Sequence, residues 1–433
     1  MGATNVGTTG LYTGAFLHYN GQKLVDFVPK ILDRMSAPAD TPKSNLFRIS
    51  FDSWLSCRLI FDQQWSFRIT PIRLILLALT AAAIAIALVR LVLGLSAVTN
   101  LDDHWPWGLW IAFDVLCGVA LAGGGYGTAL LIHILHNKKL EPVARATMLT
   151  SLIGYILVVV GLFIEIGRWW NFWRPFWWWG HDSVLFEVFV CISLYTVVQT
   201  LEICEVITEK IFRVFHRFFV IIMPFLLIVG VVLPTLHQSS LGQLYVMMNG
   251  KLHPLWWSPY IFAFFFLSSF FVGPAMIAVE SVLSRCAYGH RTPVPVLKTL
   301  ARIGGAVMLV YLVLRFADIY SRGALPFLWD GSFESIAFLI EIGFGVILPL
   351  CIVFSPLANY WCALVAYGIL TSSGVIINRM NVVITGMWRE TGSIYYPAVP
   401  EVLFSLGLVT GGILVYMFLC ENFNILEHEG HKE

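Results

Sequence analysis

The chain has 433 residues, of which 58% are hydrophobic and only 12% are charged. Soluble domains carry roughly a quarter charged residues, so this composition predicts that the solvent of the chain is a lipid bilayer. A net charge of +1 provides no acidic or basic excess that would indicate a nucleic-acid partner. The eight cysteines form no CxxC or CxxCH pair, which disfavours an iron–sulfur cluster or a c-type haem in this chain, and no metal site is expected.

Apolar stretches long enough to cross hydrocarbon as a helix recur along the chain after residue 70. In chain order they lie near 71–94, 107–135, 143–168, 183–205, 212–235, 259–284, 297–320, 332–354, 358–384 and 400–420. The sequence therefore predicts an all-α integral membrane protein of about ten transmembrane helices. An even number of spans places both termini on the same side.

The distribution of Lys and Arg predicts the orientation of the spans, because positive flanks are retained in the cytoplasm. Most of the 27 basic residues lie in the terminal segments or in loops on the same side as the termini. Both termini are therefore expected in the cytoplasm of a bacterium, with the chain in its inner membrane. The opposite loops, near 102–107, 169–179, 237–257 and 388–396, are rich in Trp, Tyr, His and Pro. They indicate an aromatic belt at the interface or a docking surface for a periplasmic partner.

The expected organisation has five parts. Residues 1–70 form a cytoplasmic tail with a short amphipathic helix near 22–35, and 71–105 hold a first, peripheral span. Residues 106–245 and 246–398 form two four-helix bundles, and 399–433 hold the last span and a tail. Spans three and seven both end in an acid followed by a basic residue, Glu165 with Arg168 and Asp318 with Arg322. This weak similarity predicts that the two bundles are parallel repeats.

Ionisable side chains within spans are costly, so each of them is a candidate functional group. In the first bundle the ionisable candidates and two uncharged polar residues beside them are expected to converge near the periplasmic surface. They are Asp114, Glu165, Arg168, His181, Asp182, Glu187, His237, Gln238 and Ser239, the last three following span five. Glu165 and Arg168 could instead form a structural ion pair, and His237 could be an interfacial histidine. Asp114 has no neighbouring base, so it either pairs across helices or exchanges a proton.

The second bundle repeats this pattern with Arg315, Asp318, Glu334, Glu341 and Arg379, and Glu401 follows on span ten. A proton path and structural ion pairing are equally compatible with these residues. Haem b needs two histidines facing each other at one depth. Because His133 and His136 lie at the cytoplasmic end, and His237 and His253 are expected in a periplasmic loop, no haem is expected.

Four strings in the chain resemble one known family: PWGLWIAFD at 106–114, SVLFE at 183–187, LPTLHQSSLG at 233–242 and HPLW at 253–256. They are similar to the NrfD/polysulfide-reductase superfamily of quinone-interacting membrane subunits, in its ten-helix, HybB-like branch. The similarity extends from about span one to span ten. Relatives often have Asn before the SVLFE string, where this chain has Asp182, so this position departs from the pattern of the family.

The resemblance implies a subunit that is not catalytic alone and contains no haem and no iron–sulfur cluster. It would pass electrons between a periplasmic ferredoxin-like iron–sulfur subunit, itself bound to catalytic subunits of the hydrogenase type or a related enzyme, and menaquinone or ubiquinone. It also implies a quinone site in the first bundle, for which the candidate binding residues are Trp110, Asp114, Arg168, His181, Asp182, His237, Gln238 and Ser239.

Quinone reduction also needs protons. Buried carboxylates can supply them, so Asp114, Glu165 and Glu187 are the candidate catalytic groups. The candidate proton path consists of Arg315, Asp318, Glu341 and Arg379. A secondary transporter with parallel repeats is the main alternative, and a purely structural membrane anchor is a second one. A transporter would place Gly- or Pro-broken helices at the midplane, whereas the polar groups of this chain are expected near one face.

Overall fold

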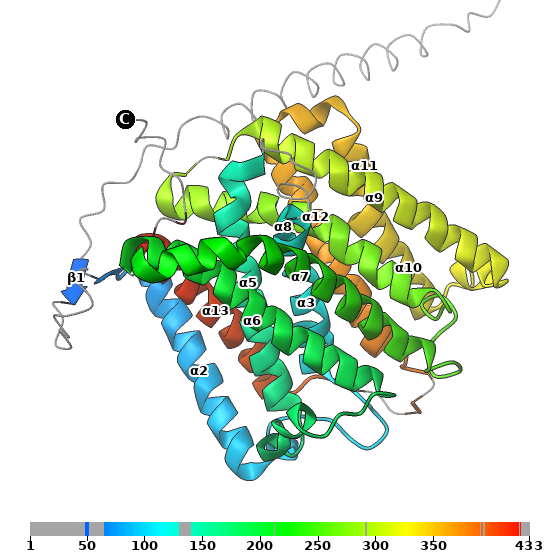
Figure 1. The fold of residues 1–433 in the computed structure, drawn as a ribbon. Coiled ribbons are helices and arrows are strands. Elements are labelled where there is room, and N and C mark those ends of the chain that lie inside the picture. The colour runs from blue at the N-terminus through cyan, green and yellow to red at the C-terminus, as the bar shows by residue number, and fades with distance from the viewer. Residues whose placement is uncertain are drawn as a thin grey trace, which may run out of the picture.

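The computed structural model describes residues 48–51, 65–129, 140–211, 213–290, 292–389, 391–392, 395–423 and 425 (Figure 1). The amphipathic segment expected near 22–35 lies outside these residues, as do His133 and His136. The described part confirms the expected class, because it holds ten helices that are long and apolar enough to cross a membrane.

Most spans are single helices that match the predicted stretches to within a few residues, apart from the C-terminal end of the fifth span. They are α2 (Pro71–Leu93), α5 (Glu141–Glu165), α6 (Val184–Ile211), α7 (Arg213–Val246), α8 (Ile261–Tyr288), α9 (Val294–Ser321) and α13 (Val399–Asn422). The short 3-10 helices η1 (Leu95–Ala97), η5 (Trp169–Asn171), η6 (Arg174–Phe176), η7 (Leu325–Leu328) and η9 (Pro356–Asn359) lie between spans. A two-stranded antiparallel hairpin, β1 (Arg48–Phe51) and β2 (Trp65–Arg68), precedes α2.

Three spans contain a π-helical segment. Span two consists of η2 (Trp110–Cys117), α3 (Gly118–Leu121) and α4 (Gly124–Ala129). Span eight consists of α10 (Phe333–Ile342), η8 (Gly343–Ile347) and α11 (Leu348–Val353), and span nine of α12 (Trp361–Met380) and η10 (Asn381–Thr385). Such segments are rare and often mark functional positions. The η2 segment carries Asp114, one of the candidate catalytic residues.

The first and last spans lie side by side. Helix α2 packs mainly against α13, which also contacts α5, and Figure 1 shows the blue α2 beside the red α13. Arg73 at the start of α2 forms an ion pair with Glu421 at the end of α13. This pair places the start of α2 and the end of α13 on one side of the molecule. We call this side the inner side, and the opposite side, which holds Leu93 and Val399, the outer side.

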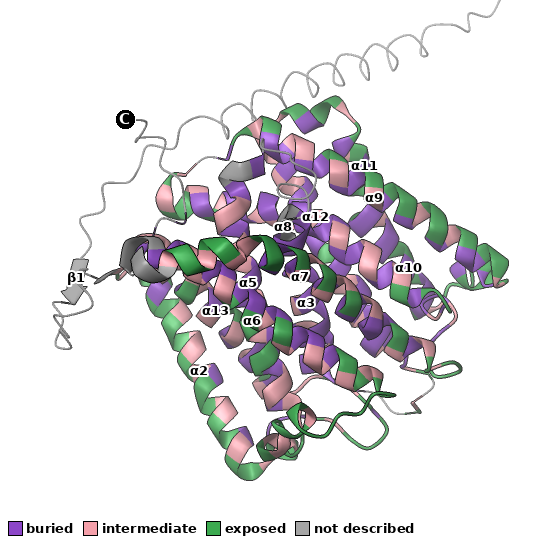
Figure 2. Cartoon of the chain, in the orientation of Figure 1, coloured by how far each residue is buried: buried purple, intermediate pink, exposed green. Residues whose placement is uncertain are grey.

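Helix α8 lies in the centre of the helical array. It contacts α3, α4, α7, α9 and α12, and 67% of its most apolar stretch is buried, against 11% for α2. Figure 2 shows the exposed residues along the outward faces of the helices and the buried ones between them. The division into two parallel four-helix bundles stays a prediction.

Local sequence explains where α2 begins and ends. The Thr70 hydroxyl accepts a hydrogen bond from the backbone N–H of Arg73, and Pro71 stands in the first turn, where a missing N–H costs nothing. The helix ends at Gly94, whose φ of 92° is readily adopted only by glycine. The same rules apply elsewhere: the Ser332 hydroxyl accepts from the backbone N–H of Ser335 at the start of α10, and α8 ends before Gly289, whose φ is 70°.

One predicted boundary was wrong. Span five was expected to end near residue 235, but α7 continues to Val246. The drop in hydropathy at Thr235, Ser239 and Ser240 does not break the helix, because each hydroxyl donates to the backbone carbonyl four residues earlier. His237 and Gln238 therefore lie within the span and are fully buried.

Spans eight and nine approach each other closely through two glycines. A Cβ added to Gly345 would lie 2.5 Å from the Cα of Gly374, and one added to Gly374 would overlap the backbone of Gly345. We expect Gly374→Leu to lower the free energy of unfolding by about 1–3 kcal/mol, the usual cost of overpacking. Thermal unfolding in detergent measures this effect. Gly343→Leu is the matched control, because a Cβ there meets no atom within 4 Å; an equal loss of stability in both variants would contradict the prediction.

Candidate functional site

A buried histidine and a tyrosine form the centre of the first group of polar side chains. The ring of His237 on α7 has no exposed surface. Its Nδ1 lies 2.9 Å from the carbonyl oxygen of Leu233, and its Nε2 lies 2.7 Å from the hydroxyl of Tyr155 on α5. Because a carbonyl can only accept, Nδ1 carries the hydrogen, and Nε2 accepts the hydrogen bond from Tyr155.

Further polar side chains extend from this pair along α5 and α6. The Tyr155 ring packs edge-on against that of Tyr195, with centroids 4.5 Å apart. The Gln199 amide donates to the Tyr195 hydroxyl at 2.8 Å and to the Ser151 hydroxyl at 2.6 Å. Ser151 in turn donates to the carbonyl of Ala122. We call Ser151, Tyr155, Tyr195, Gln199 and His237 the tyrosine–histidine network.

Gln238 joins this network to span two. Its amide nitrogen donates to the carbonyl of Val119, 2.9 Å away, on the helix that carries Asp114. Its Oε1 atom and that of Gln199 are buried and accept no hydrogen bond from the part of the chain that the structure describes. A buried carbonyl oxygen without a hydrogen-bond donor lowers stability, so both oxygens can accept a hydrogen bond from a bound ligand or water. Ser239, by contrast, is half-buried and bonds only to the carbonyl of Thr235.

Asp114 belongs to a second group of polar residues. Its carboxylate is 5% exposed, and its Oδ2 accepts a hydrogen bond of 2.7 Å from the hydroxyl of Ser405 on α13. Its Oδ1 has no partner among the described residues. Gly161 on α5 gives Asp114 room, since a Cβ at that glycine would lie 2.9 Å from the Asp114 Cβ. One carboxylate oxygen is thus held in place and the other is free.

Three further charged residues lie on the outer side of Asp114, grouped around Glu165. Glu165, at the end of α5, lies close enough to Asp114, Glu401 and Arg90 for their charges to interact. Arg90 of α2 is buried and donates to the carbonyls of Ile164 and Ile166. We call Asp114, Glu165, Glu401 and Arg90 the acid cluster. Arg90 is the cation of this cluster that the sequence analysis did not assign, although a lone arginine near the end of an apolar span was a signal for it.

The carboxylate of Glu401 is held by its surroundings. It accepts hydrogen bonds from the backbone N–H groups of Asn100 and Ala398 and from the Tyr395 hydroxyl. Trp110, a predicted binding residue, donates its indole N–H to the carbonyl of Glu401. Burial, followed by the bond to Glu401, raises the pKa of the Tyr395 phenol in the loop before α13 above its usual range. Glu401 thus connects the end of the loop to span two and has a structural role.

Other predicted site residues lie elsewhere. Arg168 is exposed, and no ion pair between it and Glu165 occurs in the described structure. His181, Asp182 and Glu187 are exposed on the outer loop and at the start of α6, away from both buried groups. The predicted convergence at one level is therefore only partly found: Asp114 and Glu165 come together, and His237 and Gln238 come together.

The two groups lie at different depths along α5. Asp114 packs against Gly161, and His237 bonds to Tyr155, which is six residues earlier. A rise of 1.5 Å per residue separates these levels by roughly 9 Å. The difference arises because α7 continues beyond its predicted end, which moves His237 into the membrane. Both groups still lie in the outer half of the helical array.

An apolar groove runs beside the acid cluster. It lies between α2, α5 and α13, has a volume of about 200 Å³, and is lined by residues that include Ala83, Leu157, Val160, Phe404 and Leu408. Its rim reaches the surface at Ile84 and Ile156, which are 58% and 42% exposed. Leu408 also lies near Asp114, because a Cβ on Gly161 would be 3.9 Å from Leu408 Cδ2 and 2.9 Å from the Asp114 Cβ. The groove therefore leads from the lipid-facing surface to the vicinity of a buried carboxylate.

The acids and arginines of the second half form well-bonded sets. Glu341 accepts hydrogen bonds from Trp256, Asn378 and Asn381 at 2.7–2.9 Å. Arg379 donates to Asn378 and Ser268, and its guanidinium lies 3.6 Å from the centroid of the Phe265 ring. Glu334, near the outer surface, pairs with Arg389 at 2.6 Å.

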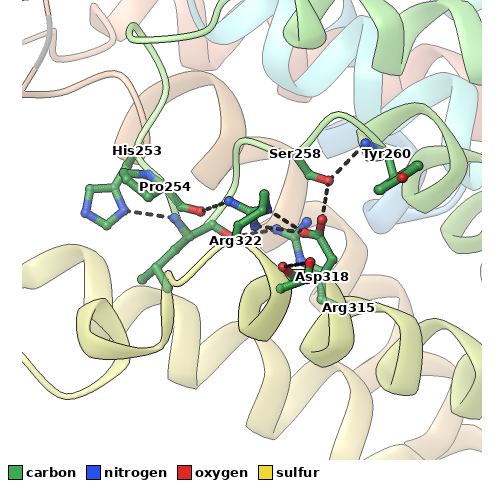
Figure 3. Close-up of polar contacts among 9 residues, drawn as sticks. His253, Pro254, Ser258, Tyr260, Arg315, Asp318 and Arg322 are labelled. Atoms are coloured by element: carbon green, nitrogen blue, oxygen red, sulfur yellow. Dashed lines mark hydrogen bonds and ion pairs between the residues drawn. The ribbon is translucent and has the colours of Figure 1, made fainter.

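Figure 3 shows how Arg315 and Asp318 of α9, and Arg322 directly after it, hold the outer loop before α8. Asp318 accepts from Ser258 and forms an ion pair of 2.7 Å with Arg322. Arg322 donates to the carbonyl of Pro254, and Arg315 donates to that of Leu255. These contacts tie the loop to α9. The proton path that was predicted through Arg315, Asp318, Glu341 and Arg379 stays a prediction.

Comparison with known proteins gives the family. The model of the polysulphide reductase NrfD family matches residues 97–389, which is more than half of the chain. The chain belongs to the NrfD family. A protein of Nitratidesulfovibrio vulgaris is 31% identical over 377 residues, covering 84% of this chain and 97% of its own length.

Two other relatives of this NrfD chain carry descriptive names. A probable Ni/Fe-hydrogenase 2 b-type cytochrome subunit of Escherichia coli is 31% identical over 360 residues, covering 79% of this chain and 91% of its own length. The integral membrane subunit of a menaquinone reductase from N. vulgaris is 30% identical over 239 residues, covering 52% of this chain and 56% of its own length. One name describes a b-type cytochrome subunit of a hydrogenase, and the other an integral membrane subunit of a menaquinone reductase.

The E. coli name corrects one expectation. It describes a b-type cytochrome subunit, which contradicts the expectation that this chain carries no haem. One premise of that expectation was also wrong, because His237 lies inside a span and not in a loop. His237 itself has both ring nitrogens engaged, with the Leu233 carbonyl and the Tyr155 hydroxyl, so in this arrangement it does not fit the role of an axial ligand.

Proposed function

We propose that this chain is the quinone-reactive membrane subunit of a bacterial respiratory complex. It would pass electrons between an iron–sulfur protein of the ferredoxin type on the outer, periplasmic side and the menaquinone or ubiquinone pool. The proposal rests mainly on one observation: Asp114, a buried carboxylate with one free oxygen, lies close to Leu408, which lines an apolar groove that opens to the lipid-facing surface. The names of two relatives, which describe subunits of a hydrogenase and of a menaquinone reductase, support it.

In this proposal the isoprenoid tail of the quinone occupies the groove between α2, α5 and α13. The head group lies in the outer half of the first bundle, between the level of Asp114 and that of Tyr155 and His237. One hydrogen bond of about 2.8 Å at each carbonyl oxygen, together with the quinone ring between them, spans a distance of the size that separates the Asp114 level from the Tyr155 level. Binding requires the Tyr155 hydroxyl to leave His237 and turn toward the quinone. Asp114 and Tyr155 then donate to its two carbonyl oxygens.

Reduction needs two electrons and two protons. In this proposal the electrons come from the iron–sulfur partner. The role of this chain is to bind the quinone and to protonate it. Asp114 gives a proton to one carbonyl oxygen, and Tyr155 gives a proton to the other, so that two O–H bonds form in the quinol. Positioned proton donors of this kind accelerate a reaction by about 10²–10⁴-fold. Glu165, which lies near both Asp114 and Arg90, is placed to help restore the proton of Asp114 from the outer side.

Purification of the complex through a tag on this chain tests the proposal. We expect iron–sulfur and catalytic subunits to co-purify and the complex to reduce a menaquinone analogue when the catalytic subunit receives its electron donor. The complex without this chain should retain activity with an artificial dye and lose activity with quinone. A chain that purifies alone and takes up a solute into vesicles would support the transporter alternative. A complex that reduces quinone equally well without this chain would contradict the proposal.

A further inference from the structure

A buried acid that the proposed reaction does not use lies in the inner half of α6. The side chain of Glu202 is 5% exposed, and the structure gives it no hydrogen bond or ion pair with a described residue. Counted along α6, it stands nine residues from the inner end at Ile211 and eighteen from the outer end at Val184. At 1.5 Å per residue it lies roughly 14 Å from the inner end. A buried carboxyl group with no ion-pair partner is costly and often takes part in proton transfer.

Glu202 shares one face of α6 with the tyrosine–histidine network. Gln199 is three residues away from it and Tyr195 seven, so the three side chains follow each other along the helix at spacings of one turn. The charge of Glu202 is near enough to act on the Tyr195 hydroxyl. The free Oε1 of Gln199 lies one turn from the carboxyl group. Polar side chains therefore continue from the inner half to Tyr155 and His237 in the outer half.

The opposite helix leaves space for the carboxyl group. A Cβ at Gly230 of α7 would lie 2.8 Å from Glu202 Oε1. Any other residue at this position would press against the carboxyl group or force it to turn. Among the described elements, helices α6 and α7 make the most extensive contact, so a position between them is normally filled by a side chain. Glycine here is explained if the carboxyl group must be free to change its direction.

We propose that Glu202 and the tyrosine–histidine network form a proton path that leads from the inner side to the quinone. The inference rests on the proposed function. Glu202 takes a proton from the inner side and passes it by way of the hydroxyls of Tyr195 and Ser151, and of water bound at the Gln199 oxygen, to Tyr155. Tyr155 has given its own proton to the quinone and recovers one in this way. For each quinone reduced, one proton then leaves the inner side, and positive charge moves toward the outer side.

The test uses the complete complex in sealed proteoliposomes, with two readouts: the rate of quinone reduction and the membrane potential generated per quinol. We expect Glu202→Gln to reduce the rate about tenfold or more and to reduce the potential per quinol. Glu202→Asp, which keeps an ionisable group, should recover part of both. Glu205→Gln is the matched control on the same helix, since Glu205 is half-buried beside His216 outside the network, and it should behave as the wild type.

Gly230→Ala is a second variant that leaves every polar group in place. We expect it to slow quinone reduction in the same direction as Glu202→Gln, because its Cβ restricts the carboxyl group. Wild-type rate and potential in Glu202→Gln, or an equal loss in Glu205→Gln, would overturn the proton path. A wild-type complex that reduces quinone without generating a potential would also overturn it and leave the proposed function standing. A wild-type complex that reduces no quinone would contradict the proposed function itself.

Discussion

Asp114→Asn is expected to lower quinone reduction by the assembled complex by about 10²-fold or more, because the amide keeps the size of the carboxyl group but cannot give up a proton. Ser405 can still donate to the amide oxygen, so folding should be preserved. Steady-state reduction of a menaquinone analogue measures the loss. Dye reduction by the catalytic subunit should be unchanged in the same preparation.

Glu187→Gln is the matched control for this prediction. Glu187 is also an acid at the outer end of a span and was a predicted catalytic residue, but it is exposed at the start of α6. We expect the variant to retain most of the wild-type activity. Full activity in Asp114→Asn would remove Asp114 from the mechanism, and a loss in Glu187→Gln as large as in Asp114→Asn would place the reaction at the exposed outer loop.

Glu341→Leu should cause the largest loss of stability among single substitutions in the second half of the chain. It removes the acceptor for three buried donors, those of Trp256, Asn378 and Asn381. Each buried donor without a partner costs about 1–3 kcal/mol, so we expect the free energy of unfolding to fall by about 3 kcal/mol or more. Thermal unfolding in detergent measures the change.

Ile340→Leu, at the neighbouring lipid-exposed position, is the control for a general effect of substitution in this span. It should leave the melting temperature unchanged. Glu341→Gln separates a structural role from a proton path. The amide oxygen can still accept hydrogen bonds, so stability should fall less than in Glu341→Leu. If Glu341→Gln is stable and its complex reduces quinone normally, Glu341 is a structural acceptor only; a stable variant with slow quinone reduction would support the proton path.

The positions of the spans could be predicted from the sequence because the length of an apolar run is set by the thickness of the hydrocarbon. The end of α7 could not, because hydropathy treats Thr235, Ser239 and Ser240 as polar. Within a helix their hydroxyls bond to the helix's own carbonyls and cost little. This one boundary changed the depth of His237 and thereby the argument about haem.

The composition of the candidate site was predicted better than its arrangement. Asp114 is a lone acid in an apolar span, and it is buried in the structure as expected. Its partner Ser405 could not be found from the sequence, because the contact joins span two to span ten and depends on tertiary packing. Tyr155, Tyr195 and Gln199 were missed because uncharged polar residues in a span are less conspicuous than charged ones. Their spacing along one face of each helix was the available signal.

The most direct test of the account is photoaffinity labelling of the complex with a long-tailed quinone analogue, followed by identification of the labelled peptides. The account predicts labelling of α5 and α13 around Leu157 and Leu408, which unlabelled menaquinone suppresses in a saturable manner. The larger apolar groove on α10 and α11, of about 480 Å³ and lined by Ile340 and Phe344, serves as the internal comparison. Saturable labelling there, with none on α5 and α13, would contradict the proposed quinone site.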